Sequence, residues 1–229
     1  MAKETIAIID YGSGNIASAA KAMEHVINAE GLNAEVLITD KAEDLLEAGR
    51  ILLPGQGAFG DCMTNLRKSG LIEPLEEAVI QNGTPFLGIC VGMQLLATRG
   101  LEHGSHEGLD WIKGQVVPIK PDNPDLKIPH MGWNEVHPVS YEGSAFEQDN
   151  QHFVLRSTFS SKEVAKHYYF VHSYMFECHY SHHVLGIADY GGPIISIVGR
   201  DNILGVQFHP EKSAQDGLEL IAAFAKWRP

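Results

Sequence analysis

The sequence predicts an α/β protein with a mostly parallel central sheet flanked by helices, and with an additional antiparallel layer of strands in the C-terminal half. In the first half, short apolar runs alternate with helical stretches, which is typical of right-handed βαβ crossovers and parallel strand pairing. In the second half, strand-like runs follow one another with turn signals between them. A chain of 229 residues is long enough to bury one sizeable core. We therefore expect a single domain over residues 1–229.

Four strand–helix pairs are expected in the first half. Each strand is a short run rich in apolar residues, and each following segment has the length or the apolar spacing of a helix. In chain order the pairs cover residues 6–9 and 16–29, 35–38 and 42–48, 50–54 and 71–81, and 85–89 and 93–97.

Six strands and a closing helix are expected in the second half. The strands cover residues 115–119, 133–136, 168–171, 184–190, 194–199 and 204–208. Near the C-terminus, apolar residues recur at i, i+3, i+4 and i+7, which predicts an amphipathic helix. These residues are Leu218, Ile221, Ala222 and Ala225.

Cys90 lies at the bend between a predicted strand and a predicted helix, in the sequence Gly88-Ile89-Cys90-Val91-Gly92. A tight strand-to-helix turn pushes its side chain out of the backbone, and the flanking glycines leave room for the bend. The N-terminus of the following helix favours a thiolate over a thiol. Cys90 is therefore a candidate nucleophile, although so short a motif is also compatible with a buried structural cysteine.

His209 and Glu211 follow the apolar run at 203–208. Residues two apart in an extended chain point to the same side, so Glu211 can lie beside the imidazole. A base that takes a proton from a thiol needs a third group to fix its tautomer, and a carboxylate serves this purpose. Sites of α/β proteins gather at the carboxyl ends of strands, which favours an active-site pair over a chance surface pair.

A glycine-flanked loop, Gly55-Gln56-Gly57, follows the strand at 50–54. Such a loop can turn backbone N–H groups toward a ligand. Together with the Val91 N–H, it can form an oxyanion hole for an intermediate on Cys90. We expect the oxyanion donors among Val91, Gln56 and Gly57, although the loop alone is also compatible with an ordinary strand-to-helix turn.

Taken together, these motifs resemble the class I glutamine amidotransferases, and among them most closely the glutaminase subunits of imidazole glycerol phosphate synthase, an enzyme of histidine biosynthesis. The broader resemblance rests on residues 87–94 and 205–213. The narrower one rests on four further segments in the same order as in the family. They are Asp-Tyr-Gly-Ser-Gly-Asn at 10–15, Pro-Gly-Gln-Gly-Ala-Phe at 54–59, Ile-Pro-His-Met-Gly-Trp-Asn at 128–134 and Tyr-Phe-Val-His-Ser-Tyr at 169–174.

The resemblance implies a flavodoxin-like core and the hydrolysis of glutamine to glutamate and ammonia, without a cofactor or a metal. It makes Cys90 the nucleophile, His209 the general base and acid, and Glu211 the group that orients the histidine. It also implies a heterodimer with a cyclase subunit, to which the ammonia is channelled.

Further positions are assigned by the same resemblance. Those that match the glutamine pocket are Gly55, Gly57, Gln94, Ser173 and Tyr174. Those that match the face toward the cyclase are Asn15, Trp133, Tyr169 and Lys212. The loop at 55–57 matches a segment that must reorient to complete the oxyanion hole.

Two features depart from the family pattern. Gln56 stands where a small aliphatic residue is usual, so a polar side chain enters the loop at 55–57. The segment at 141–166 is longer than the usual connection and rich in Ser, Glu, Gln and Asn, which indicates a surface excursion.

Composition narrows the class of protein. A net charge of −12 argues against binding to nucleic acid or to an anionic membrane. Three cysteines make no disulfide framework, which suits a reducing compartment. The sequence begins without the apolar segment of a signal peptide, and no apolar run approaches the ~18 residues of a membrane span. We expect a cytoplasmic protein.

Several alternatives remain open at this stage. Residues 12–17 fit a dinucleotide fingerprint, but the nearest acidic residue at a following strand end, Asp40, lies farther along than the ~20 residues usual for it. A histidine-rich stretch invites a zinc site, but the chain lacks paired cysteine ligands there; it contains His167, His172, Cys178, His179, His182 and His183. Other functions compatible with the motifs are a glutaminase that feeds a different synthase, for example in sugar amidation, a stand-alone γ-glutamyl hydrolase, and a non-catalytic scaffold.

Overall fold

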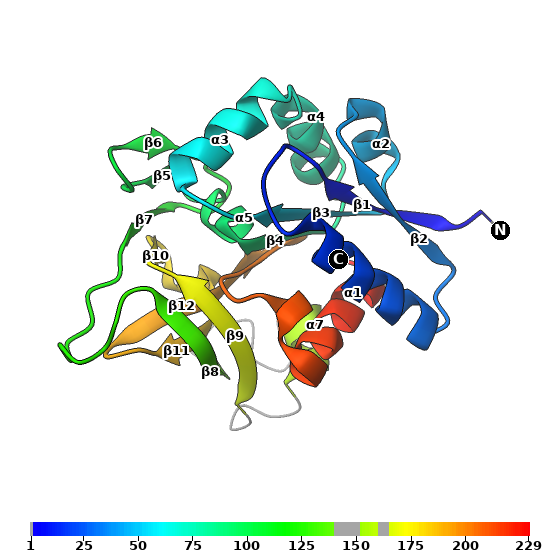
Figure 1. Ribbon diagram of the computed structural model, residues 1–229. Helices are drawn as coiled ribbons and strands as arrows, with labels where there is room; N and C mark the ends of the chain where they lie inside the picture. The colour runs from blue at the N-terminus through cyan, green and yellow to red at the C-terminus, as the bar shows by residue number, and fades with distance from the viewer. Residues whose placement is uncertain (1, 140–151, 160–164) are drawn as a thin grey trace.

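Figure 1 shows a computed structural model of the chain, which describes residues 2–139, 152–159 and 165–229. In this part of the chain, the strands form one nine-stranded sheet and one four-stranded sheet. In spatial order, the larger sheet contains β2 (Ala34–Thr39), β1 (Glu4–Ile9), β3 (Arg50–Gly55), β4 (Phe86–Cys90), β13 (Ile203–Val206), β12 (Pro193–Arg200), β11 (Val184–Asp189), β8 (His130–Pro138) and β9 (Lys166–His172). The smaller one contains β10 (Tyr174–Cys178), β7 (Gly114–Pro118), β5 (Arg99–Gly100) and β6 (His106–Glu107).

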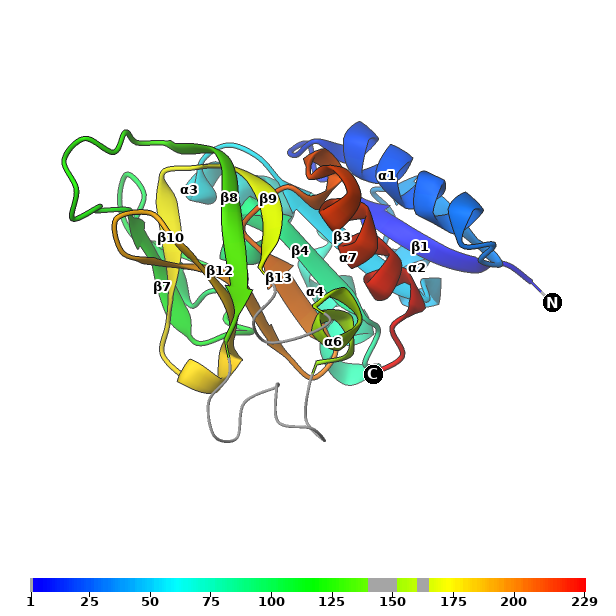
Figure 2. The same ribbon diagram turned by 90° about the horizontal axis from the view of Figure 1, so that it is seen from below.

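Helices cover both faces of the parallel half of the large sheet. They are α1 (Ile16–Ala29), α2 (Ala42–Glu47), α3 (Phe59–Lys68), α4 (Ile72–Glu76), α5 (Val91–Gln94), α6 (Phe153–Thr158) and α7 (Ala214–Lys226). Short helical turns cover Glu77–Gln81, Ser181–His183 and Pro210–Lys212. α1 and α7 lie side by side on one face, and α2, α3 and α4 lie on the other (Figures 1 and 2). Among the described residues, no helix combines the length and the apolar character needed to cross a membrane.

The predicted α/β fold is confirmed, and the sheet divides by pairing direction. β2, β1, β3, β4 and β13 pair in parallel. Residues 6–9 of β1 are fully buried, as expected for a parallel strand covered on both faces. From β13 onward, β12, β11, β8 and β9 pair antiparallel. Most of the predicted antiparallel strands thus extend the main sheet, because short connections join β11 to β12 and β12 to β13, and β8 and β9 continue the sheet from the free edge of β11.

Some elements differ from the prediction. The helix α3 was not predicted, because Gly60, Asp61, Thr64 and Asn65 are poor helix formers. The helix predicted at 71–81 is α4 followed by a wider helical turn. β5, β6 and β10 were also missed, since two of them contain only two residues each. The segment predicted to be a surface excursion lies largely outside the described residues, apart from α6, which packs against α7.

Arg50 ties the first residue of β3 to the C-terminal end of the chain. Its side chain is fully buried, and its Nη1 lies 2.5 Å from Oε1 of Glu4. Its Nε donates to the Phe224 carbonyl at 3.0 Å, and its Nη2 donates to the Trp227 carbonyl at 2.6 Å. A guanidinium in this position stabilises the fold only while all of these partners are present, because buried charges and carbonyls left unpaired are costly.

Replacing Arg50 with alanine is expected to lower the free energy of unfolding by about 3 kcal/mol, because a buried ion pair is broken and two carbonyls lose their donor. Arg228→Ala is the matched control, since Arg228 pairs with the same Glu4 at 2.9 Å but has a side chain that is 65% exposed. The control should cost less than about 1 kcal/mol. Urea unfolding at pH 7 measures the free energy of unfolding of both variants. Equal losses in the two would contradict the stabilising role given to the buried Arg50 side chain.

Candidate active site

Cys90 ends β4 at a sharp turn into α5. Its φ of +56° is unusual for a residue other than glycine. A Cβ added to Gly92 would lie 1.8 Å from the Leu53 carbonyl oxygen, and one added to Gly88 would lie 2.6 Å from the Gly92 carbonyl oxygen. Both glycines are therefore required by close backbone contacts, and the turn places Cys90 at the carboxyl end of its strand, as predicted.

His209 and Glu211 form a buried pair beside Cys90. The His209 Nδ1 lies 2.8 Å from Glu211 Oε1, and the two side chains are 5% and 2% exposed. The His209 N–H donates to the Tyr169 carbonyl at 2.9 Å, and the Ser213 hydroxyl donates to the His209 carbonyl at 2.6 Å. These bonds fix the backbone that carries the imidazole.

The local geometry of this pair differs from the prediction. The expectation of extended backbone through Glu211 is wrong, because β13 ends at Val206 and Glu211 lies in the helical turn Pro210–Lys212. Pro210 begins that turn with the fixed φ that suits a first helical position. The carboxylate reaches the imidazole from the turn.

Charge at His209 follows from its neighbours. Burial lowers the pKa of His209, but hydrogen bonds from its ring to Cys90 and Glu211 outweigh burial and raise the pKa to about 9. The ring is therefore protonated at neutral pH. An imidazolium beside the Cys90 sulfur stabilises a thiolate, which is the nucleophilic form.

A cavity of about 290 Å³ opens above these residues. The predicted site residues that line it are Gln56, Gly57, Cys90, Val91, Gln94, Ser173, Tyr174, His209 and Lys212. Gly55 and Glu211 are not part of its lining: Gly55 packs against the Val91–Gly92 backbone, and Glu211 contacts His209. The cavity is also lined by four residues that were not predicted as site residues: Glu102, Pro129, Val171 and His172.

Two hydrogen bonds to the Gln56 carbonyl hold the loop at 55–57, which was predicted to supply oxyanion donors. The Ser13 hydroxyl donates to the Gln56 carbonyl at 2.7 Å, and the Cys62 thiol donates to it at 3.4 Å. Burial raises the pKa of Cys62, which keeps this thiol protonated as a donor. The Gln56 side chain is exposed, and Gly57 has a φ of +105° that favours glycine.

The predicted partner-facing residues fall in three places. The rings of Trp133 and Tyr169 meet edge to face, with centroids 6.3 Å apart, across β8 and β9. Lys212 lines the cavity, whereas Asn15 lies in the loop before α1. Trp133 is 55% exposed, so a large aromatic surface is open near the cavity wall formed by β9.

The loop at 12–17, which resembles a dinucleotide fingerprint, packs against the end of β3. A Cβ added to Gly14 would lie 2.9 Å from the Pro54 carbonyl oxygen, and Ser13 contacts Gln56. The loop is thus part of the wall behind the oxyanion loop. This packing favours a role at the active site or in a subunit contact over binding of a dinucleotide.

The histidine-rich stretch is spread over several elements. His172 ends β9 beside the cavity, while His182 and His183 belong to a helical turn before β11. In the described ranges, no group of three or more histidine, cysteine or carboxylate side chains is arranged to hold a metal ion.

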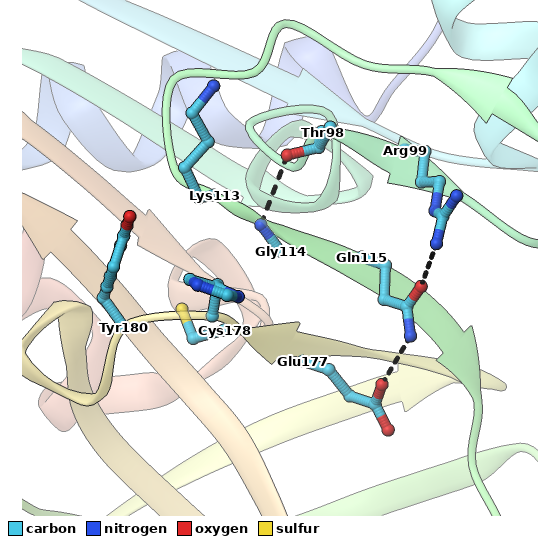
Figure 3. Close-up of a pocket in the computed structure, with 9 residues that line it drawn as sticks. Thr98, Arg99, Lys113, Gly114, Gln115, Glu177, Cys178 and Tyr180 are labelled. Carbon is cyan, nitrogen blue, oxygen red and sulfur yellow. Dashed lines mark hydrogen bonds between the residues drawn. The ribbon is translucent and has the colours of Figure 1, made fainter.

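A second cavity, of about 580 Å³, lies beside the smaller sheet (Figure 3). Its polar side chains pair with one another: Arg99 donates to Gln115 at 3.1 Å, and Gln115 donates to Glu177 at 2.9 Å. Burial raises the pKa of the Cys178 thiol to about 12, so it is no nucleophile at neutral pH. The smaller cavity above Cys90 is therefore the candidate active site.

Comparison with known proteins places this geometry in a family. Residues 7–226 match the family model "Glutamine amidotransferase class-I". The chain is 46% identical to the imidazole glycerol phosphate synthase subunit HisH of Rhodopseudomonas palustris, covering 98% of this chain and 100% of that one. It is 48% identical to the HisH subunit of Cereibacter sphaeroides, covering 97% and 98%.

Solved structures agree on the fold. The structure of PurLQS from Thermotoga maritima aligns with a TM-score of 0.66 at 17% identity, covering 97% of this chain and 98% of that one. A glutamine amidotransferase from Thermotoga maritima aligns with a TM-score of 0.61 at 18% identity, covering 94% of this chain and 80% of that one. With the family model and the relatives above, it follows that the chain belongs to the class I glutamine amidotransferases and, within them, to the HisH subunits of imidazole glycerol phosphate synthase.

Proposed function

We propose that this chain is the glutaminase subunit of an imidazole glycerol phosphate synthase, which hydrolyses glutamine and passes ammonia to a cyclase subunit in histidine biosynthesis. The observation that carries the proposal is the arrangement of Cys90, His209 and Glu211 at the carboxyl ends of two adjacent parallel strands, β4 and β13. The near full-length similarity to HisH subunits supports the choice of substrate and partner.

The reaction begins with attack of the Cys90 thiolate on the side-chain amide carbon of glutamine. The N–H of Val91 and a donor from the Gln56–Gly57 loop hold the oxyanion. His209 protonates the departing nitrogen, so that ammonia leaves and a γ-glutamyl thioester remains on Cys90. His209 then takes a proton from water, whose oxygen attacks the thioester and releases glutamate and the free cysteine.

Substrate and partner contacts follow from the cavity and from the exposed strand beside it. Gly57, Gln94, Ser173 and Tyr174 line the cavity and are the proposed glutamine-binding residues. Gly55 belongs to the proposal only as the residue that packs behind them, against the Val91–Gly92 backbone. Asn15, Trp133, Tyr169 and Lys212 are the proposed contacts with the cyclase. Large apolar side chains at 128, 131 and 133 are 43–60% exposed, which favours a protein partner on this face. The proposal also includes a single domain over residues 1–229 and a cytoplasmic heterodimer of this chain with the cyclase subunit.

The test is glutamate release from glutamine by the wild type and by Cys90→Ala, each with and without the candidate cyclase and its nucleotide substrate. We expect the cyclase and the nucleotide to stimulate the wild type, and Cys90→Ala to lose at least roughly 10³-fold in kcat, because the nucleophile is gone.

Each alternative predicts a different outcome of this test. High activity of the chain alone would favour an independent γ-glutamyl hydrolase. Stimulation only by a different synthase would favour a glutaminase of another pathway. Equal rates for the wild type and Cys90→Ala would overturn the catalytic assignment.

A further inference from the structure

Buried polar side chains form an unbroken line from the surface strand β8 to Cys90. The line passes through Asn134, His130 and His172 to the Tyr174 carbonyl, and continues through Gln94 and Gln207. His130, His172, Gln94 and Gln207 are between 0% and 6% exposed. Polar groups at such depth stabilise a structure only when each donor meets an acceptor.

The proton on His172 is fixed by a backbone carbonyl. Its Nδ1 lies 2.8 Å from the Tyr174 carbonyl oxygen, which can only accept, so Nδ1 carries the hydrogen. Burial lowers the pKa of His172 to about 3, so the ring is neutral. Its Nε2 is therefore an acceptor.

The position of the ring hydrogen on His130 is fixed by its neighbours in turn. Its Nδ1 lies 2.9 Å from Nε2 of His172, so His130 donates from Nδ1. Burial lowers the pKa of His130 to about 4, and its Nε2 accepts from the Asn134 amide at 3.2 Å. The other hydrogen of that amide goes to the Asp189 carbonyl at 2.8 Å, and Asn134 Oδ1 accepts from the Glu135 N–H at 2.8 Å. The direction of every bond from Asn134 to Tyr174 is thereby determined.

A second donor reaches the Tyr174 carbonyl from the side of Cys90. Gln94 Nε2 donates to the Tyr174 carbonyl at 3.2 Å and to Gln207 Oε1 at 2.9 Å. Gln207 Nε2 then approaches the Cys90 sulfur at 3.8 Å. The Tyr174 carbonyl thus receives two donors, one on the path from His130 and one on the path from Cys90.

Aromatic stacking restricts motion of His130. Its ring is stacked with Phe170 at 4.7 Å and with Tyr190 at 4.1 Å between centroids. The Tyr190 hydroxyl is itself held by the Lys127 carbonyl at 2.7 Å. The His130 ring therefore provides a rigid support for His172.

The part of the line that His172 holds is also a wall of the candidate site. His172, Ser173 and Tyr174 line the cavity together with Gln94. The Ser173 carbonyl accepts from the Ile119 N–H at 2.9 Å, so both carbonyls of this turn are fixed from behind. Hydrogen bonds that served only to join β8 to β9 would end at His172. These bonds continue to the cavity and to Cys90, which indicates a role at the candidate site.

We propose that His172, supported by His130, is a positioning residue of the glutaminase: its Nδ1–H fixes the Tyr174 carbonyl and, through it, the Gln94 amide that faces glutamine. This deepens the proposed function and rests on it. The residue touches no reacting atom in this scheme and acts on the shape of the substrate pocket. Its loss should therefore raise the KM for glutamine more than it lowers kcat.

Two substitutions of His172 separate its two bonds. The amide of His172→Asn places a donor where Nδ1 lies and keeps the bond to Tyr174, whereas the amide of His172→Gln reaches the position of Nε2 and keeps the contact with His130. With the cyclase and its nucleotide present, we expect His172→Gln to raise the KM for glutamine about tenfold with less than about a threefold change in kcat. His172→Asn should stay within about threefold of the wild-type KM. Equal KM values in both variants, or a loss confined to kcat and thermal stability, would overturn the positioning role.

A spectroscopic measurement tests the hydrogen-bond line without any activity. In ¹⁵N-histidine-labelled full chain, long-range ¹H–¹⁵N spectra assigned with the His130 and His172 variants should show both rings as neutral Nδ1–H tautomers from pH 5.5 to 8. Free neutral histidine prefers the Nε2–H form. Nε2–H tautomers at either position would therefore contradict the hydrogen-bond directions assigned between Asn134 and Tyr174. If the wild type released no glutamate in any mixture, the proposed function would fail. These spectra would still show whether the hydrogen bonds through His130 and His172 have the assigned directions.

Discussion

Glu211→Gln is expected to lower kcat for glutamine hydrolysis by roughly 10³–10⁴-fold, the scale seen when the orienting carboxylate of another catalytic triad becomes an amide. Glu211 Oε1 accepts from His209 Nδ1 at 2.8 Å, away from solvent. A glutamine that presents its amide donor to Nδ1 forces the ring proton onto the nitrogen facing Cys90. That nitrogen then cannot accept a further proton, so the ring cannot act as the base at the site of reaction. Glutamate release in the presence of the cyclase measures the effect.

Glu30→Gln is the matched control for this substitution. Glu30 forms an exposed ion pair with Lys226 at 2.6 Å, far along the chain from the active site. We expect its kcat to stay within about twofold of the wild type, because exposed pairs contribute little. A Glu211→Gln enzyme with a rate like that of the control would remove Glu211 from the mechanism.

The hydrogen bonds of His209 with Cys90 and Glu211 predict how stability depends on pH. The pKa of His209 is about 9 in the folded chain, against 6.5 for a free histidine. Because the folded state binds this proton more tightly, the stabilisation is fully present below pH 6.5 and is lost as the pH rises to 9. The shift corresponds to about 3 kcal/mol at most. Urea unfolding should therefore show a larger loss between pH 6.5 and 9 for the wild type than for Glu211→Gln, and parallel curves would contradict the raised pKa.

Gly92→Ala is expected to destabilise the chain by about 4 kcal/mol or to prevent folding. The added Cβ would lie 1.8 Å from the Leu53 carbonyl oxygen. That atom belongs to the backbone of the central strand β3, which cannot move aside without breaking its ladder. Far-UV circular dichroism and urea unfolding report the outcome.

Gly31→Ala separates collision from backbone strain in this experiment. Gly31 has a φ of +62°, and an added Cβ would meet nothing within 4 Å. Its cost should be only about 1 kcal/mol, from the left-handed conformation. If Gly92→Ala cost no more than Gly31→Ala, the close contact between β3 and the turn at Cys90 would be wrong.

The parts of the site that local chemistry specifies are the ones that can be predicted from the sequence. The glycines around Cys90 and the spacing of His209 and Glu211 predict residues that the structure brings together, because each motif carries its own geometric requirement. The prediction of extended backbone at Glu211 fails, since Pro210 starts a turn there. The predicted contact between Glu211 and His209 is nevertheless present, because the turn also brings the Glu211 carboxylate to the His209 ring.

The parts that were missed depend on contacts between distant segments. Gln207 looks like a single polar residue in an apolar run, and only the fold reveals that it meets Gln94, 113 residues away. Ser13 and Cys62 are 49 residues apart, and no local pattern indicates that both bond the Gln56 carbonyl. A buried polar residue inside an apolar run is the one signal that could have pointed to Gln207.

The last strand of the chain occupies the middle of the sheet. β13 lies between β4 and β12, and it is the strand through which the parallel and antiparallel halves are joined. During synthesis, the nucleophile on β4 therefore waits for a neighbour that emerges more than a hundred residues later, just before the base itself. Until then both halves have an open edge, which makes the incomplete chain prone to aggregation and slow to finish folding. The same order of synthesis means that a chain interrupted anywhere before β13 is left without His209 and cannot hydrolyse glutamine by this mechanism.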